Sequence, residues 1–285
     1  SAPTSPPEAP LPGPLGSMTV TETPRFSANQ ANVRPNMPAP QIVSLAMDKP
    51  PFYCQFRASL QLGHDVSEDH PILDWKDGVP VARAFDDPYF SLGNGLAESR
   101  YVFLEGNSLP ERFEPRFHIA ELGFGTGMNV LAAWHAWLEA DVEGPMRFTT
   151  FEQFPMTRAD MARAHLAYPE LLPLSEELLS GLTPSGFDSA SLSLQIVQGD
   201  AREVLPAWHG KVDAWFLDGF SPAKNPELWE ESLLAEVARH TASGGTAATY
   251  SAAGSVRRGL EAAGFIVERI PGYGRKRHMT VARLP

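Results

Sequence analysis

The pattern of apolar and polar positions changes character twice along the chain. Residues 1–45 are rich in Pro, Ser and Ala and contain few large apolar residues, so this segment is predicted to be a disordered tail. Residues 46–117, mainly from Ile72 onward, carry short strand-like pieces separated by turn signals. In ILDWKDGVPVARAF the pair Asp77-Gly78 stands between two extended stretches, which is typical of a β-hairpin. We therefore expect a β-rich N-terminal extension over residues 46–117.

From residue 118 to residue 285 apolar strand-like runs alternate with amphipathic helical runs. Such alternation predicts an α/β domain whose mostly parallel sheet is covered by helices on both faces. The strand-like runs are FHIAELG, RFTTFE, LQIVQGD, VDAWFLDGF and GGTAATYS, and the first helix carries Val130, Leu131, Trp134, Trp137 and Leu138 at helical spacing.

Two segments depart from this simple alternation. Residues around 156–182 contain two expected helices and widen the second crossover, which predicts a helical insertion beside the main sheet. The ending GFIVERIPGYGRKRHMTVARL has the pattern of two strands joined by a Gly-rich turn. The last strand is therefore expected to run antiparallel to the others.

Composition narrows the class of protein. The only cysteine, Cys54, excludes an intrachain disulfide framework and a multi-cysteine zinc site, and no metal is expected. No apolar run approaches the roughly 20 residues of a spanning helix, so a soluble, cytoplasmic protein is predicted. The net charge of −11 argues against a general basic field, so any contact with nucleic acid must be local.

The string HIAELGFGTGMNVLAAW carries the first candidate site. Gly123, Gly125 and Gly127 follow Glu121 between a strand-like run and a helical run. A loop that enters a helix presents unpaired N–H groups and a positive dipole end, and glycines let a ligand approach that backbone closely. The dinucleotide fingerprint requires its third glycine at the position of Met128, so this loop does not match it.

Further acids follow the next strand-like runs. Glu152 is placed where a carboxylate can accept both ribose hydroxyls of an adenosine. Asp200 and the backbone of Ala201 are placed where they could reach the adenine amino group. Asp218 ends the apolar run 212–217 at the sheet edge where such folds bind ligands, beside the short loop GFSPAK. The series predicts one crevice lined by acids.

The spacing of the glycines and their acid is similar to the first motif of class I S-adenosylmethionine-dependent methyltransferases. Most of the chain from about residue 72 onward resembles the methyltransferase module of the MnmC family, the bifunctional tRNA 5-methylaminomethyl-2-thiouridine biosynthesis proteins, and its stand-alone form. The strings that carry the resemblance are FDDPYFSLGNGLAESRYVFLEGN, ELGFGTGMNVL, FEQFPMTRADMARAH, DAWFLDGFSPAKNPELW, GSVRRGLEAAGF and GYGRKRHM.

The resemblance implies a Rossmann-like class I methyltransferase that uses S-adenosyl-L-methionine. It further implies methylation of the primary amine of 5-aminomethyl-(2-thio)uridine at the tRNA wobble position. Asp218 would orient that amine and accept a proton. In the bifunctional family a flavin-dependent oxidoreductase module acts on the same side chain; only methylation is expected of this chain, with a separate oxidoreductase as a possible partner.

Several side chains are expected to contact the tRNA anticodon stem-loop. Aromatic rings could stack on the flipped-out uracil, with core packing as the alternative for each ring. Cations near the C-terminus could contact backbone phosphates, with a solvated surface cluster as the alternative. The substrate-side candidates are Tyr89, Phe90, Phe220, Lys224, Arg275, Lys276 and Arg277, and the wider basic segment adds Arg257, Arg258 and Arg269.

Three other functions remain open at this point. A class I methyltransferase or aminopropyltransferase for a small amine would share the glycine loop and the acids but would not need GYGRKRH. A nicotinamide oxidoreductase is disfavoured by the glycine spacing. A non-enzymatic adaptor would leave Asp218 and the acids of the crevice unexplained.

Overall fold

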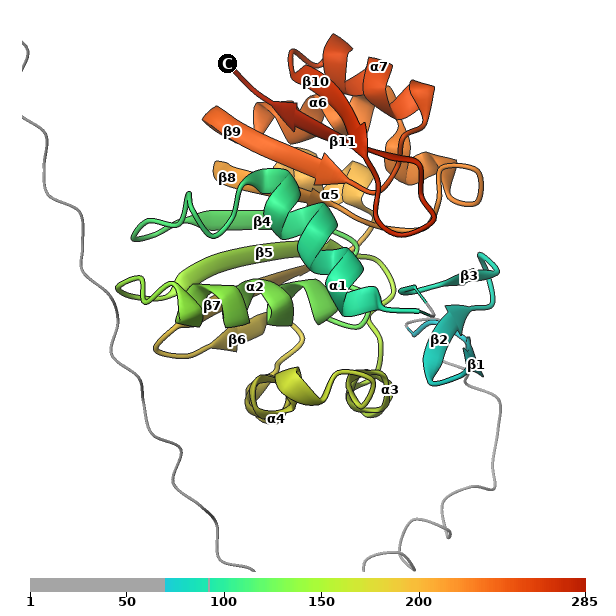
Figure 1. Cartoon of the computed structure of the whole chain (residues 1–285), viewed down its shortest axis with the longest axis vertical. Coiled ribbons are helices and arrows are strands. Elements are labelled where there is room, and N and C mark those ends of the chain that lie inside the picture. The colour runs from blue at the N-terminus through green and yellow to red at the C-terminus, as the bar shows by residue number, and fades with distance from the viewer. Residues whose placement is uncertain (1–69, 92) are drawn as a thin grey trace, which may run out of the picture. The chain divides into compact units, whose positions relative to one another are not determined.

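An eight-stranded sheet organises the part of the chain that the computed structural model describes, residues 70–91 and 93–285 (Figure 1). The predicted tail 1–45 and Cys54 lie outside the described residues. The strand order is β10-β11-β9-β8-β4-β5-β7-β6. The strands are β4 (His118–Leu122), β5 (Met146–Glu152), β6 (Gly186–Asp188), β7 (Leu192–Gln198), β8 (Val212–Leu217), β9 (Thr241–Thr249), β10 (Ile266–Pro271) and β11 (His278–Arg283).

The directions of the strands agree with the sequence-based prediction. Strands β9, β8, β4, β5 and β7 pair in parallel. The last strand, β11, runs antiparallel to both β9 and β10, and the short edge strand β6 runs antiparallel to β7. The chain leaves β4 toward β5 on one side and later returns to β8 on the other side, so the connections diverge above the carboxyl ends of β4 and β8. Such a divergence opens a crevice at the sheet edge.

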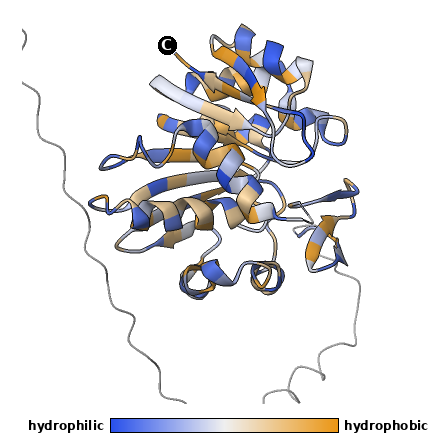
Figure 2. Ribbon diagram, in the orientation of Figure 1, coloured by the Kyte–Doolittle hydropathy of each residue, from blue (hydrophilic) through white to orange (hydrophobic). Residues whose placement is uncertain are grey.

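Alternating side chains of the strands enter two separate apolar cores, one on each face of the sheet. In β8, Ala214 and Phe216 belong to one core, whereas Trp215 and Leu217 belong to the other. Figure 2 shows the corresponding changes of hydropathy along the strands and helices. A sheet covered on both faces needs apolar residues at successive strand positions, which explains the continuous apolar run of β8.

Helices supply the other half of each core. Helices α1 and α2 cross the near face of the sheet in Figure 1, and α2 packs against η2 and β5. The second core contains buried residues of α5, α6 and α7. The helical segments are α1 (Gly95–Ser99), η2 (Arg100–Leu104), η3 (Glu105–Asn107), α2 (Met128–Glu139), α3 (Arg158–His165), η4 (Pro169–Leu171), α4 (Leu172–Gly181), α5 (Ala201–Ala207), η5 (Pro226–Trp229), α6 (Glu231–Arg239) and α7 (Gly254–Ala262).

The expected hairpin is present at the start of the described chain. Strands β1 (Leu73–Lys76) and β2 (Val79–Ala82) pair antiparallel, and β3 (Asp87–Pro88) extends this small sheet. Asp77 and Gly78 both have positive φ, 50° and 82°, as a tight two-residue hairpin turn requires.

One stretch within the described part of the N-terminal extension is helical where a β-rich segment was expected. Residues 95–107 form the continuous helical run α1-η2-η3. The Asn94 side chain accepts a hydrogen bond from the Ala97 N–H at its start, and Leu96 and Phe103 are buried. The cap and this apolar spacing are typical of a helix, but the turn residues before them led to a prediction of strands. The helices predicted within 156–182 are α3, η4 and α4.

Asn107 fastens this helical run to the sheet. Its fully buried amide donates to the carbonyl oxygens of Phe103 (2.9 Å) and Trp215 (3.2 Å), and it accepts from the Thr246 hydroxyl (2.6 Å). The Arg112 guanidinium donates to the Asn107 carbonyl oxygen at 3.0 Å. One amide therefore connects η3 to both β8 and β9.

We expect Asn107→Ala to lower the free energy of unfolding by about 2–3 kcal/mol, because it leaves buried polar groups without partners. Urea denaturation followed by circular dichroism measures the effect. Glu105→Gln, an exposed change in the same helical turn, serves as the control and should stay within about 0.5 kcal/mol of the parent. A loss as small as that of the control would show that Asn107 does not secure this contact.

Candidate functional site

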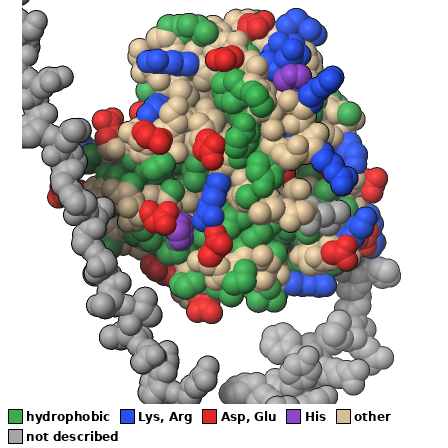
Figure 3. Space-filling model, viewed as in Figure 1, with side chains coloured by type: hydrophobic (Ala, Val, Ile, Leu, Met, Phe, Trp, Pro, Cys, Tyr) green, Lys and Arg blue, Asp and Glu red, His purple; other side chains and the backbone are tan. Residues whose placement is uncertain are grey.

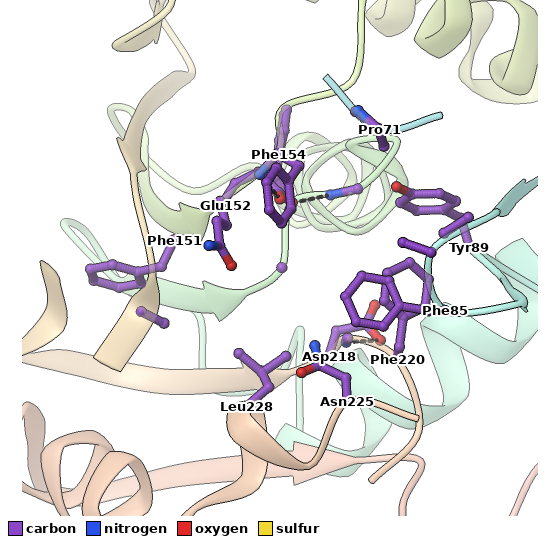
Figure 4. A pocket seen from close by; sticks show the side chains of 18 of the residues that line it. Pro71, Phe85, Tyr89, Phe151, Glu152, Phe154, Asp218, Phe220, Asn225 and Leu228 are labelled. Carbon is purple, nitrogen blue, oxygen red and sulfur yellow. Dashed lines mark hydrogen bonds between the residues drawn. The ribbon is translucent and has the colours of Figure 1, made fainter. Parts of the chain in front are cut away.

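A cavity of about 840 Å³ lies at the carboxyl ends of β4, β5, β7 and β8 (Figure 4). The loop after each of these strands forms one part of its wall, and segment 70–72 together with residues between 82 and 89 forms another. Of the residues singled out in the sequence, the cavity is lined by Tyr89, Gly123, Gly125, Glu152, Asp200, Ala201, Asp218 and Phe220.

The glycine loop has a backbone that other residues would adopt only with strain. Gly123, Gly125 and Gly127 have φ values of 82°, 53° and 77°. A Cβ on Gly125 would lie 3.0 Å from the ring of Tyr89, so a side chain there would fill the space between the loop and the opposite wall. Gly127 precedes the first residue of α2 and packs against Phe124, outside the cavity lining. Its position shapes the loop and does not bring it to a ligand.

Glu121 is fully buried and lies behind the cavity, not on its wall. Its carboxylate accepts hydrogen bonds from the Asn129 amide (2.8 Å) and the Thr150 hydroxyl (3.0 Å). Burial raises the pKa of Glu121 well above its ordinary value, and the nearby charge of Asp218 adds to the rise. Glu121 can therefore reach a ligand only through Asn129.

Asn129 is a member of the site that the sequence reasoning missed. Its amide nitrogen donates both to Glu121 and, at 2.7 Å, to the second carboxylate, Asp218. Its amide oxygen accepts from the Ser99 hydroxyl at 2.5 Å, which determines the orientation of the group. The available signal was its place in the first turn of the helix that follows the glycine loop, on the cavity wall.

Asp218 occupies the end of β8 beside the glycine loop. One of its oxygens accepts from Asn129 and the other from the Gly219 N–H at 2.8 Å. Burial raises the pKa of Asp218 to about 6, while the hydrogen bonds from Gly219 and Asn129 oppose the rise. The result is a carboxylate that is mostly ionised near neutral pH and yet binds a proton more readily than a surface aspartate.

The Glu152 carboxylate lies across the cavity from Asp218, as Figure 4 shows. One oxygen accepts from the Gly125 N–H (3.0 Å) and the other from the Phe154 N–H (2.8 Å). A carboxylate has about four acceptor sites, so each oxygen can still accept one hydroxyl. This geometry fits a vicinal diol such as that of a ribose.

The surroundings of Asp200 differ from the sequence-based expectation of a free acceptor for adenine. Its carboxylate caps α5 by accepting from the Arg202 N–H (2.9 Å), and it pairs with the Arg202 guanidinium at 2.6 Å. The hydrogen bond from Arg202 lowers the pKa of Asp200. Arg202 also lines the cavity and was missed in the sequence, whereas Ala201 lies on the wall as predicted.

Aromatic rings form the wall around Asp218. Phe220 stacks on Phe85 with ring centres 4.5 Å apart, and the edge of Tyr89 meets Phe220 at 5.2 Å. Phe85 lies opposite Phe220 and was not predicted. Phe90, predicted to face the substrate, is buried instead against Tyr168 with ring centres 5.4 Å apart, and it does not line the cavity. The two residues lie in a bend after β3, where Tyr89 lines the cavity and Phe90 packs into the core.

Lys224 does not point to the cavity either. Its ammonium pairs with the Asp87 carboxylate at 3.3 Å and donates to the carbonyl oxygen of Asp86. The Ser221 N–H donates to the same Asp87 side chain at 3.1 Å. These contacts join the loop after β8 to the small N-terminal sheet, so Lys224 holds the cavity wall in place.

The C-terminal cations divide into two groups. Arg275, Lys276 and Arg277 are all exposed, but the Lys276 ammonium also pairs with Glu98 at 2.7 Å and lies 4.0 Å from the ring centre of Tyr250. Figure 3 shows Lys and Arg side chains gathered over the region of α7 and β10. The pKa of His278 in this region is lowered by burial and by the neighbouring positive charges of Arg269, Arg277 and Arg257.

Two further properties concern the described residues alone. No three His, Cys, Asp or Glu side chains among residues 70–91 and 93–285 come close enough to hold a metal ion. In the same part of the chain, none of the helices combines the length and the apolar character needed to cross a membrane.

Comparison with known proteins places these features in context. Residues 171–285 match the S-adenosyl-L-methionine-dependent methyltransferase family. The tRNA 5-methylaminomethyl-2-thiouridine biosynthesis bifunctional protein MnmC of Ectopseudomonas mendocina is 46% identical over 221 residues, which cover 73% of this chain and 34% of that protein. MnmC of Chromobacterium violaceum is 43% identical over 228 residues, again covering 34% of the relative. The chain thus spans about a third of the length of these curated relatives.

A solved structure is also similar to the chain. MnmC2 from Aquifex aeolicus superposes with a TM-score of 0.60 at 30% sequence identity, covering 77% of this chain and 72% of that one.

We expect Glu152→Ala to weaken binding of S-adenosyl-L-methionine by about 1.5–3 kcal/mol, because charge-assisted hydrogen bonds to a diol are lost. Isothermal titration calorimetry with the cofactor or its demethylated product measures the change. Glu139→Ala, an exposed acid at the end of α2, is the control. Unchanged affinity in the Glu152 variant would remove this residue from the cofactor site.

Proposed function

Because the chain belongs to the MnmC family of S-adenosyl-L-methionine-dependent methyltransferases, we propose that it methylates the primary amine of 5-aminomethyl-(2-thio)uridine at the wobble position of tRNA. The product would be 5-methylaminomethyl-2-thiouridine. The observation that carries the proposal is the position of Asp218, a carboxylate with raised proton affinity between the glycine loop and an aromatic wall.

The cavity fits S-adenosyl-L-methionine in its shape and in its donors and acceptors. Gly125 leaves room that a Cβ would fill, and Glu152 retains acceptor sites for two ribose hydroxyls. Ala201 lines the wall on the side where an adenine would lie. When bound, the cofactor supplies a methyl group activated by a sulfonium.

Asp218 would act on the acceptor amine. Direct displacement of a methyl group requires a neutral amine held in line with the breaking bond, so positioning and proton removal are the main tasks of the protein. Asn129 and Gly219 each donate to one oxygen of Asp218, which holds the carboxylate in one orientation. Its raised pKa makes it a better proton acceptor than an ordinary aspartate.

The wobble base would be read by the aromatic wall. Bases in single-stranded loops are commonly recognised by stacking on aromatic side chains. Phe220, Tyr89 and Phe85 all line the cavity, with Phe85 stacked on Phe220. A uracil placed there would bring its 5-substituent to the carboxylate.

The exposed cations of the β10–β11 turn would contact tRNA phosphates. Arg275 and Arg277 face solvent, and the structure gives neither an acidic partner among the residues it describes. Arg257 and Arg269 extend the positive surface around His278. In a protein with a net charge of −11, this local patch is the natural contact for the anticodon stem-loop.

The domain boundaries, a partner enzyme and the cellular location complete the proposed function. We assign residues 118–285 to the catalytic domain and residues 46–117 to an N-terminal extension, of which residues between 70 and 89 line the cavity. A separate flavin-dependent oxidoreductase could act on the same side chain of the tRNA. A cytoplasmic location fits a tRNA substrate and a sequence with one cysteine.

We expect Asp218→Asn to retain affinity for S-adenosyl-L-methionine and to lose roughly a hundredfold or more in methyl transfer, because the variant cannot accept a proton. Single-turnover transfer to tRNA and cofactor calorimetry separate the two effects. Equal losses of affinity and transfer would make Asp218 a cofactor ligand instead.

The pH dependence of the wild-type reaction is part of the same prediction. The pKa of Asp218 is about 6, so its ionised form accumulates above that pH. The single-turnover rate should therefore rise through about pH 6, and it should rise further as the amine loses its proton. A flat profile would contradict both the role of Asp218 and an amine acceptor.

We expect the double variant Arg275→Glu and Arg277→Glu to bind tRNA weakly and to reduce the slope of log affinity against log salt by roughly one per lost phosphate contact. Cofactor affinity should stay unchanged. Filter binding across salt concentrations, with turnover on hypomodified tRNA and on the isolated nucleoside, provides the measurement.

The control for this experiment reverses the charge of two exposed arginines near the amino ends of β4 and β5, Arg116→Glu and Arg147→Glu. It changes the net charge equally but should preserve tRNA affinity. If wild-type turnover is no faster on tRNA than on the nucleoside, the small-amine alternative is favoured and the patch does not read tRNA.

A further inference from the structure

The middle cation of the RKR turn, Lys276, has a side chain that is 46% exposed, and its ammonium contacts residues of two other segments. Lys276 pairs with Glu98 at 2.7 Å and covers the ring of Tyr250 at 4.0 Å. The Glu98 side chain is only 13% exposed. Removing a carboxylate from water is costly unless a cation pairs with it, so Lys276 offsets part of the cost of holding Glu98 at this place. Lys276 was predicted to contact phosphate, and this contact gives it a different task.

One series of contacts runs from this pair to the first oxygen of Asp218. The Tyr250 ring lies under Lys276, and its hydroxyl donates to the carbonyl oxygen of Gly219 at 2.7 Å. The Gly219 N–H in turn donates to Asp218 at 2.8 Å. The turn between β10 and β11 is therefore connected through Tyr250 to Gly219, which donates to the carboxylate.

A second series reaches the other oxygen of Asp218 from the α1 side. Ser99 follows Glu98 in the helix, and its hydroxyl donates to the Asn129 amide at 2.5 Å. Asn129 donates to Asp218 at 2.7 Å. Both oxygens of Asp218 are thus held by groups that depend on Glu98, Lys276 or their immediate neighbours.

The charges that act on Asp218 come from several elements. Lys276, in the β10–β11 turn, favours the ionised carboxylate, whereas Glu98, in α1, disfavours it. Glu121 of β4 lies behind Asn129, and its own carboxyl also experiences the charge of Glu152 from β5. Tyr250, after β9, has a pKa raised by burial and then by Asp218, so it stays neutral. Lys276 is the one cation among these groups.

We propose that Glu98 and Lys276 are positioning residues for methyl transfer, which as a pair hold Tyr250 and the Asp218–Gly219 turn and balance the charge beside the Asp218 carboxylate. The role in methyl transfer rests on the proposed function. The effect of the pair on Asp218 is a property of the protein without substrate or cofactor. Neither side chain lines the cavity, so each acts through other residues.

The test measures the ionisation of Asp218 directly, without substrate or cofactor. In protein labelled with ¹³C at aspartate carboxyl groups, the Asp218 signal is assigned by its loss in Asp218→Asn and titrated by NMR. Lys276→Met leaves Glu98 unbalanced and should raise the titration midpoint on the order of one pH unit. Glu98→Gln leaves Lys276 unbalanced and should lower the midpoint by a similar amount.

Matched variants separate charge from folding. Lys276→Arg keeps the charge and should keep the midpoint near that of the wild type. Arg275→Met removes a neighbouring exposed cation and should leave the midpoint unchanged, since solvent screens that charge. Shifts of opposite sign in the Lys276 and Glu98 variants cannot arise from a common loss of packing.

Single-turnover methylation of tRNA with saturating cofactor gives the second readout. The pH profiles of Lys276→Met and Glu98→Gln should shift in the same directions as the NMR midpoints. Midpoints that move together, or that do not move, would overturn the inference even if the wild type methylates tRNA. If the two variants shift the NMR midpoint in opposite directions but the wild type transfers no methyl group to tRNA, the proposed function is contradicted instead.

Discussion

Two carboxylates share one amide group at the centre of the site. The Asn129 nitrogen donates to Glu121 at 2.8 Å and to Asp218 at 2.7 Å, and no other arrangement of this side chain would satisfy both acids. Burial raises the pKa of both acids, and the charge of Asp218 adds to the rise at Glu121. Asn129 can contact both acids only when the glycine loop, the start of α2 and the end of β8 have the right positions relative to one another.

The sheet makes these relative positions possible. Glu121 and Asp218 lie on adjacent parallel strands, paired in the register Leu122 to Leu217, so both acids arrive at the same edge. Asn129 follows the glycine loop in the first turn of α2, and Ser99 reaches its amide from the helical run that Asn107 fastens to the sheet. Packing far from the cavity therefore determines the orientation of a carboxylate within it.

Much of this architecture could be predicted from the sequence, because strand periodicity and strand-end position are local properties. The parallel sheet, its antiparallel last strand and the hairpin at Asp77-Gly78 followed from apolar alternation and turn chemistry. Acids after successive strands converge for the same topological reason.

The orientation of individual side chains could not be predicted in this way. Phe90 and Tyr89 are neighbours, yet only Tyr89 faces the cavity, because the bend after β3 and the contact of Phe90 with Tyr168 decide between them. Lys276 looked equivalent to its arginine neighbours until tertiary contacts placed Glu98 beside it. Helical residues 95–107 were missed because the turn-rich sequence before them suggested strands.

The wall formed by residues 82–89 has a consequence for how molecules enter and leave. This wall contacts the loop after β8 through the Phe85–Phe220 stack and the Lys224–Asp87 ion pair. The strands of the main sheet, in contrast, are held by continuous ladders of hydrogen bonds and by two buried cores. Breaking these few contacts exposes far less apolar surface than unfolding the sheet, so this wall can open as a local unit at a small fraction of the global stability. A separation of this wall would widen the route by which a cofactor enters and leaves the cavity, without unfolding of the sheet.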